Sequence, residues 1–166
     1  MKNIVIFASG EGTNAQRIID YFKGSGKVNV SMVVSNKSTA PVLLKAALNN
    51  VPIMILDKRE YFATEELVRF LQKEKTDLIV LAGFLFLIPK ILTDAFPDQI
   101  INVHPALLPK YGGQGMYGIK VHETVIAAHE KESGMSIHYV NEKFDEGKII
   151  LQAKCKVAEG ETPETL

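Results

Sequence analysis

Two polar side chains stand close together at the end of a short apolar run. Asn102 and His104 follow Ile100 and Ile101, and on an extended chain residues two apart point to the same side. An amide can stabilise a developing oxyanion and an imidazole can move a proton, which suits chemistry at a carbonyl group. A histidine at a strand end also serves structural hydrogen bonding, so the pair alone leaves both roles open.

A glycine-rich loop, Ser9-Gly10-Glu11-Gly12-Thr13-Asn14, is a second candidate for binding. Glycines let backbone N–H groups approach an anion, and a following helix adds the partial positive charge of its N-terminus. Gly10, Gly12 and Ala15 also fit the loose dinucleotide pattern, but the next strand ends at Ser35-Asn36 without the carboxylate that would hold a ribose. We therefore favour a phosphate site without a dinucleotide; a tight turn that binds nothing is the alternative.

The elements that must position these residues alternate between strands and helices. Short apolar runs predict strands at residues 4–8, 28–34, 53–56, 78–82 and 100–103. Most of these runs are apolar on consecutive residues, as expected for strands of a parallel sheet covered on both faces. Apolar residues with helical spacing lie between them, at positions 15, 18, 19 and 22 and at positions 67, 70 and 71. This alternation predicts an α/β fold with a doubly wound, Rossmann-like, mostly parallel sheet, in which ligands bind at the carboxyl ends of the strands.

The last third of the chain has a different pattern. Residues 121, 125 and 128 form a helical stripe, and from 151 to 157 apolar residues alternate with polar ones. The alternation predicts an antiparallel addition to the sheet, with Cys155 on the side that packs. We expect one domain over residues 1–166, with Thr162-Pro163-Glu164 as the start of a C-terminal helix that the chain lacks.

The composition limits the classes of partner. Nineteen basic residues balance nineteen acidic ones, which argues against a nucleic acid partner. Cys155 is the only cysteine, so no internal disulfide or cysteine cluster can form. No signal peptide or apolar run of about 20 residues is present, so we expect a cytoplasmic location without a membrane. The spacing of His122, His129 and His138 matches no metal motif, and we expect no metal.

Four segments together resemble the folate-dependent formyltransferases. Residues 102–109, Asn-Val-His-Pro-Ala-Leu-Leu-Pro, resemble the N-[IV]-H-x-S-L-L-P signature, and Asp145-Glu146-Gly147 resembles the D-x-G element that supplies a catalytic aspartate. The loop at residues 9–14 is similar to the S-G-x-G-[ST]-N loop of the branch that formylates glycinamide ribonucleotide. Leu81-Ala82-Gly83-Phe84 is similar to the segment leading into its folate pocket.

The resemblance implies direct transfer of the formyl group of 10-formyltetrahydrofolate, a co-substrate, to the amine of glycinamide ribonucleotide, in purine biosynthesis and through a tetrahedral intermediate. Asn102 would hold the oxyanion, His104 would share that task or move the proton, and Asp145 would orient the imidazole. Contacts to the ribonucleotide phosphate and ribose are implied for Gly12, Thr13, Asn14, Pro105 and Gly113. Contacts to the folate are implied for Arg59, Leu85, Phe86, Leu87, Ile88, Asn102, Val140 and Asn141.

Some positions depart from the family pattern, and other functions stay open. Ala106 replaces the signature serine, and some members have an arginine where Phe86 stands. His138 is expected to pack or hydrogen-bond near the site. The alternatives are a formyltetrahydrofolate hydrolase, a methionyl-tRNA formyltransferase and a nucleotide-binding module without catalysis. The expected partners are small molecules, and the sequence leaves monomer and homodimer open.

Overall fold

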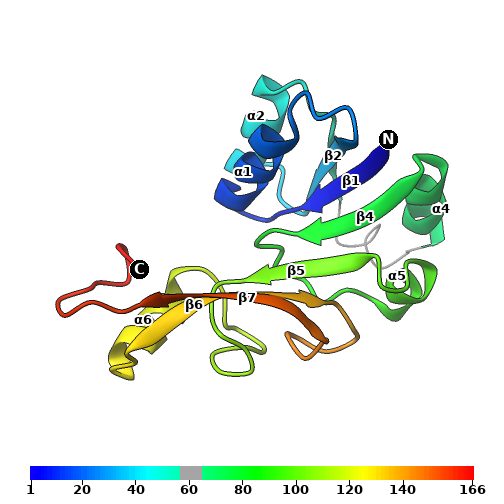
Figure 1. Cartoon of the computed structure of the whole chain (residues 1–166). Helices are drawn as coiled ribbons and strands as arrows, with labels where there is room; N and C mark the ends of the chain where they lie inside the picture. Colours follow the sequence, from blue (N-terminus) through cyan, green and yellow to red (C-terminus); the bar gives the residue numbers. More distant parts are fainter. Residues whose placement is uncertain (57–64) are drawn as a thin grey trace. The chain divides into compact units, whose positions relative to one another are not determined.

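The computed structural model describes residues 1–56 and 65–166 and divides into two compact units, Met1–Ile101 and Asn102–Leu166 (Figure 1). The hydrogen-bonded order of the strands is β3-β2-β1-β4-β5-β6-β7. The elements are β1 (Lys2–Phe7), α1 (Thr13–Phe22), β2 (Val28–Ser35), α2 (Pro41–Leu48), β3 (Ile53–Ile55), α4 (Glu65–Lys73), β4 (Thr76–Leu81), α5 (Lys90–Ala95), β5 (Ile100–His104), α6 (Ile119–Ala127), β6 (Glu132–Tyr139) and β7 (Ile149–Lys156). This confirms the predicted α/β fold with a mostly parallel sheet and an antiparallel C-terminal addition.

The first unit is built around the parallel strands β3, β2, β1 and β4. β1 pairs with β2 on one side and with β4 on the other, so the chain order reverses at β1. Val5, Ile6 and Phe7 are fully buried, as their consecutive apolar pattern predicted for a strand covered on both faces. The loops that follow β1 and β4 leave the sheet at its carboxyl edge beside this reversal, the usual place for a ligand in open α/β sheets.

Helices pack on these strands in two groups. α1 and α2 contact each other and β2, whereas α4 contacts β4 and α5, as Figure 1 also shows. α2 was not predicted from the sequence, because its eight residues are mostly apolar and lack a polar face that would reveal a helical period. Pro41 begins this helix at a position where its missing N–H costs no hydrogen bond. None of the helices in the described ranges is long and apolar enough to cross a membrane.

The second unit contains the antiparallel pair β6 and β7 and the helix α6. Ser136 pairs with Gln152 and Met135 with Ala153 across the two strands. The prediction that the apolar side of β7 packs is wrong: Cys155 is exposed and Leu151 is 58% exposed. In residues 102–166, all of which are described, α6 is the only helix, and the alternating pattern does not tell which face of the strand pair is covered. At the chain end the predicted helix start appears as one turn, in which Leu166 N–H donates to the Thr162 carbonyl at 3.1 Å.

Candidate functional site

The loop after β1 turns on Gly12, which begins α1. Gly12 has a left-handed backbone (φ 71°), and a Cβ on it would lie only 2.5 Å from the Cβ of Val42. Glycine is therefore required here for its backbone conformation and for its close approach to α2. Thr13 and Asn14 follow with exposed side chains, and no side chain caps the helix start. The N–H groups of the first helical turn are thus available to an anion.

The rest of this loop is fastened by hydrogen bonds within the first unit. The Ser9 hydroxyl, which is buried, donates to Asn36 Oδ1 at 2.6 Å and accepts from the Leu85 N–H at 3.1 Å. The Ser9 N–H donates to the Gly83 carbonyl, which joins the loop after β1 to the loop after β4. The two loops at this edge of the sheet therefore hold each other in place. Asn36 was considered in the sequence only as a missing carboxylate, and its role as the hydrogen-bond partner of Ser9 was not predicted.

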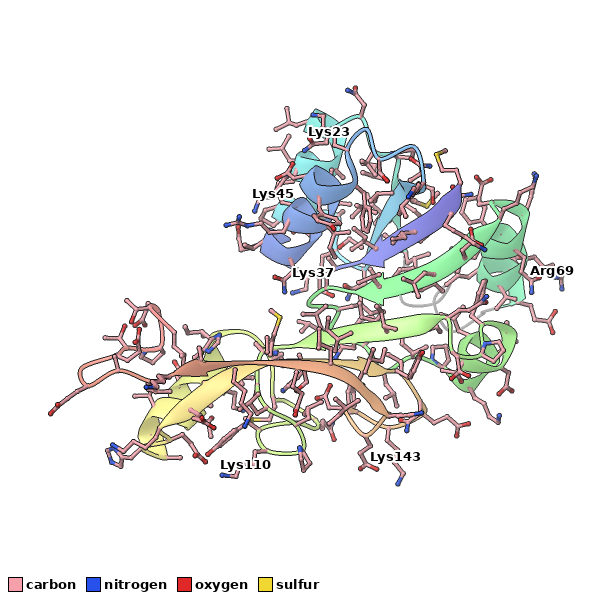
Figure 2. All side chains as sticks on the ribbon, viewed as in Figure 1. Lys23, Lys37, Lys45, Arg69, Lys110 and Lys143 are labelled. Carbon is pink, nitrogen blue, oxygen red and sulfur yellow. The ribbon has the colours of Figure 1, made fainter. Side chains whose placement is uncertain are left out.

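Lys45 adds a positive charge beside this loop. Its Nζ donates to the Glu11 carbonyl at 2.6 Å, and Figure 2 shows the side chain projecting from the helix pair α1 and α2. The first turn of α1 carries no acidic residue, although the exposed Glu11 precedes it. The arrangement of backbone N–H groups, a helix start and a lysine is suited to a phosphate group. Lys45 was not predicted from the sequence, because 34 residues separate it from Glu11.

In the second unit, β5 and the loop after β6 bring together the three residues with predicted chemical roles. Asn102 Nδ2 lies 3.1 Å from Asp145 Oδ1, and His104 Nδ1 lies 3.5 Å from Asp145 Oδ2. A carboxylate oxygen can only accept, so the amide group of Asn102 that faces it must be the NH₂. Both strand residues therefore share one carboxylate, in agreement with the expectation that their side chains point to the same side. The His104 and Asp145 side chains are only 4% and 10% exposed.

Asp145 also accepts from groups on other segments. The Gly113 N–H donates to Oδ2 at 2.9 Å, and His138 Nε2 lies 3.4 Å from Oδ1. Burial by itself would raise the pKa of the Asp145 carboxyl. Hydrogen bonding with His138 and Gly113, and the positive charge that the His104 and His138 rings can carry, together hold that pKa below its ordinary value. The carboxyl is thus an ionised acceptor at neutral pH.

His138 is almost completely buried and lies beside Asn102 and Asp145. Its Nδ1 lies 2.8 Å from the Tyr139 carbonyl, and because a carbonyl only accepts, Nδ1 carries a hydrogen. Its Nε2 lies 3.1 Å from Asn102 Nδ2. A neutral ring accepts from the amide at this atom, whereas a charged ring donates to Asp145. His138 was expected to pack or hydrogen-bond near the candidate site, and its ring lies within hydrogen-bond distance of Asn102.

Gly147 permits this arrangement by its lack of a side chain. A Cβ there would overlap the carbonyl oxygen of Tyr139 and lie 2.7 Å from the carbonyl carbon and 3.4 Å from His138 Nδ1. The glycine of the Asp-x-Gly element therefore lets the loop that carries Asp145 pass directly over the carbonyl that orients His138. From the sequence, Gly147 was identified only as part of the Asp-x-Gly element, and the steric need for a glycine there was not predicted.

A buried hydroxyl fixes the loop that follows β5. Ser136 is fully buried; its Oγ donates to the Ala106 carbonyl at 2.7 Å and accepts from the Leu108 N–H at 3.0 Å. The Gln152 side chain donates at 2.9 Å both to this hydroxyl and to the Leu108 carbonyl. The strands β6 and β7 thus hold both ends of the 106–108 segment. Ser136 and Gln152 were not predicted, since a serine and a glutamine in alternating strands carry no distinct signal.

A cavity of about 670 Å³ lies beside Asp145 in the second unit. Its walls include Leu108, Pro109, Phe144 and Gly147. The volume is in the range that takes a small organic molecule. In the described parts of the chain, no group of three or more His, Cys, Asp or Glu side chains is placed to hold a metal ion.

The residues for which folate or ribonucleotide contacts are implied have different surroundings. In the first unit, Leu87 is 39% exposed, whereas Ile88 is buried in the core, and Leu85 and Phe86 are half-buried. The Phe86 ring packs edge-on against Phe84 with the centroids 5.9 Å apart. In the second unit, Pro105, Gly113 and Val140 are half-buried and Asn141 is exposed. Arg59 lies outside the described residues.

The chain belongs to the formyl transferase family, whose sequence profile matches residues 2–166. The family predicted from the sequence motifs is thereby confirmed.

Several members of this family are similar to the chain over nearly its whole length. The chloroplastic phosphoribosylglycinamide formyltransferase of Arabidopsis thaliana is 40% identical, with 99% of this chain and 59% of that protein covered. The phosphoribosylglycinamide formyltransferase of Haemophilus influenzae is 36% identical, with 95% and 74% covered. Among solved structures, glycinamide ribonucleotide transformylase 1 from Symbiobacterium toebii has a TM-score of 0.88 at 33% identity, with 99% and 78% covered. The chain thus spans about three fifths of the plant relative and about three quarters of the bacterial ones.

Proposed function

We propose that this protein transfers the formyl group of 10-formyltetrahydrofolate to the amine of glycinamide ribonucleotide, as one formyltransferase domain over residues 1–166. The observation that carries the proposal is the shared carboxylate of Asp145, which lies within 3.1 Å of the Asn102 amide and 3.5 Å of the His104 ring. The names of the relatives support this choice of acceptor. The pathway, purine biosynthesis, is supported by the name of a trifunctional purine biosynthetic protein of Drosophila pseudoobscura that is 33% identical. The three residues fit a reaction in which an amine attacks a carbonyl carbon.

The proposed reaction requires a donor for an oxyanion and a group that moves a proton. The attacking amine forms a C–N bond with the formyl carbon, and the formyl oxygen becomes an oxyanion. Asn102 donates to this oxyanion when the N–H that faces His138 in the unbound protein donates to the substrate instead. His104 takes part in moving the amine proton toward the departing nitrogen of the folate, and ionised Asp145 balances the charge that the imidazole gains. The C–N bond to the folate then breaks, which releases tetrahydrofolate.

The glycine loop is the proposed site for the phosphate of the ribonucleotide. Gly12 supplies the close backbone approach, and Thr13 and Asn14 are exposed at the start of α1. Lys45 adds a positive charge beside them. A phosphate here would be bound mainly by backbone N–H groups, by the helix dipole and by this lysine. Pro105 and Gly113 are proposed as ribose contacts.

The folate is proposed to contact two sets of residues, each of which presents apolar side chains or backbone groups. Leu85, Phe86, Leu87 and Ile88 would supply one set of contacts, largely through the backbone at the buried Ile88. Asn102, Val140 and Asn141 would supply another, and Arg59 would meet the glutamate tail. The wider proposal is a cytoplasmic enzyme that uses small-molecule substrates, a folate co-substrate and no metal.

One assay separates this function from its alternatives. The purified chain is given 10-formyltetrahydrofolate, with and without glycinamide ribonucleotide, and release of tetrahydrofolate is followed. Release that depends on the ribonucleotide is the expected result. Release in its absence would instead favour a hydrolase, an activity named for a solved structure from Pseudomonas syringae, a formyltetrahydrofolate deformylase that is 25% identical with a TM-score of 0.79.

The other outcomes refute the proposal in distinct ways. Release that depends only on charged initiator tRNA would identify a tRNA formyltransferase, and binding of the ribonucleotide without any turnover would leave a binding module. His104→Ala is expected to lower turnover by about 10²- to 10⁴-fold, the usual contribution of a general acid or base. Asp94→Asn, an exposed carboxylate on α5, is the matched control and should keep the turnover of the unmodified protein.

A further inference from the structure

Tyr111 holds His104 through an unusual backbone conformation. Its φ is 58°, in the left-handed region that a non-glycine residue seldom adopts. In this conformation the Tyr111 carbonyl lies 2.8 Å from His104 Nε2. Since a carbonyl only accepts, Nε2 carries a hydrogen and donates it. The carbonyl of the strained residue Tyr111 therefore accepts from Nε2 of His104, the ring nitrogen that does not face Asp145.

The side chain of the same residue is tied to Glu130. The Tyr111 hydroxyl donates to Glu130 Oε1 at 2.8 Å, and Lys110 Nζ donates to the same oxygen at 2.7 Å. Hydrogen bonding to Glu130 raises the pKa of the Tyr111 phenol, and the contacts with Lys110 and Tyr111 lower the pKa of the Glu130 carboxyl. At neutral pH the phenol is thus a donor and the carboxylate an acceptor. Lys110 is 67% exposed and projects from its loop in Figure 2, so its own ion pair adds little stability.

Glu130 is itself fixed by the end of α6. His129 has a left-handed backbone (φ 53°), and its N–H donates to the Ile126 carbonyl. The Glu130 N–H donates to the Val125 carbonyl at 3.3 Å, which completes the hydrogen-bond pair of a Schellman motif. The backbone of Glu130 is therefore held at the capped end of α6, and its side chain is only 26% exposed. A rigid element thereby determines where the Tyr111 ring can lie.

We infer that Tyr111 and Glu130 are positioning residues for His104: the anchored tyrosine ring keeps its strained backbone in place, and the backbone carbonyl keeps the Nε2 hydrogen of His104 in place. The inference rests on the proposed function and adds to it the origin of the imidazole tautomer. With Nε2–H held by Tyr111, the ring can take up a further proton only at Nδ1, the nitrogen that faces Asp145 Oδ2 at 3.5 Å. Neither Tyr111 nor Glu130 needs to touch a substrate for this role.

The activity test uses substitutions that remove single groups. Tyr111→Phe deletes only the hydroxyl, and Glu130→Ala deletes its acceptor; each should lower kcat about tenfold with little change in either KM. Glu130→Gln keeps an acceptor oxygen and should restore most of the lost kcat. The Tyr111→Phe, Glu130→Ala double variant should lose no more than either single variant, because both remove the same interaction. Tyr21→Phe and Glu132→Gln, which change an exposed tyrosine and an exposed ion pair, should match the unmodified protein.

A spectroscopic test reads His104 directly and does not depend on any activity. In ¹⁵N-labelled protein the four histidines are separated by NMR, and His104 is assigned by its absence in His104→Gln. Its Nε2–H should exchange slowly in the unmodified protein, because the ring is buried and donates to a carbonyl. Tyr111→Phe should speed this exchange at least about tenfold, whereas Tyr21→Phe should not.

The two measurements together decide the inference. Unchanged exchange in Tyr111→Phe would overturn it, and so would faster exchange with unchanged kcat. If the unmodified protein does not transfer formyl groups but Tyr111→Phe still speeds exchange at His104, the proposed function fails while the control of the imidazole by Tyr111 stands.

Discussion

Substitution of Gly147 by alanine should both destabilise the protein and disable its site. The new Cβ would overlap the Tyr139 carbonyl oxygen and lie 2.7 Å from the carbonyl carbon, which is 0.7 Å inside the ordinary contact distance of 3.4 Å. The backbone of Gly147 does not have a positive φ, so the cost is steric rather than conformational. Either the Tyr139 carbonyl retreats and loses its hydrogen bond with His138 Nδ1, or the loop moves and displaces Asp145.

The usual energies of overpacking and of hydrogen bonds give the approximate size of this effect. Overpacking costs about 1–3 kcal/mol and a lost hydrogen bond about 0.5–1.5 kcal/mol, so the free energy of unfolding should fall by about 2–4 kcal/mol. For a chain of this length, the corresponding drop in Tm is roughly 5–15 °C. A displacement of Asp145 or His138 by nearly 1 Å should also lower kcat by about 100-fold.

Calorimetry and the formyl-transfer assay measure the two effects. Gly10→Ala is the control for Tm, because a Cβ at Gly10 meets nothing within 4 Å and its φ is not positive. That variant should melt within about 1 °C of the unmodified protein. If Gly147→Ala kept both the Tm and the kcat of the unmodified protein, the steric reasoning would be refuted.

Three further substitutions test other contacts of the structure. Asp145→Asn should lower the free energy of unfolding at pH 7 by about 1–3 kcal/mol in chemical denaturation, because an amide offers one acceptor oxygen where the carboxylate offers two. Since the folded-state pKa of this carboxyl lies below 3.8, the difference should shrink as pH falls through that pKa, and a difference that stays constant down to about pH 2 would contradict this. Ser136→Ala should cost about 2–4 kcal/mol in the same measurement, because it leaves a buried N–H and a buried carbonyl unpaired; a loss under about 0.5 kcal/mol would argue against that role. Lys45→Gln should raise the KM for the ribonucleotide about 3- to 10-fold with little change in kcat, whereas Lys23→Gln, at the other end of α1, should change neither.

The sequence predicted the elements that have a clear hydrophobic period. The buried strands β1, β2, β4 and β5 and the helix α1 lie within a few residues of their predicted bounds. The exposure of Cys155 was not predicted, because an alternating pattern tells which residues share a face but not whether anything covers that face.

Within the candidate site, too, only the residues related by local spacing could be predicted from the sequence pattern itself. Asn102 and His104 were visible as a pair, because local spacing on a strand is enough to place two side chains on one side. Asp145 was found only through its family element, since 43 residues separate it from Asn102 in the chain. The contacts of Ser136, Tyr111 and Glu130 depend on tertiary packing, and no local sequence pattern predicts them.

The convergence on Asp145 also bears on how the second unit unfolds. Asn102 of β5 and the N–H of Gly113 donate to its carboxylate, and His138 of β6 lies 3.4 Å from it. Opening of any one of these segments removes a partner from the carboxylate. The site is therefore expected to open only when these segments unfold together. Loss of activity on heating or in denaturant should therefore follow the cooperative unfolding of β5, β6 and the connecting loops, rather than precede it as it does in enzymes whose reacting groups lie on a mobile lid.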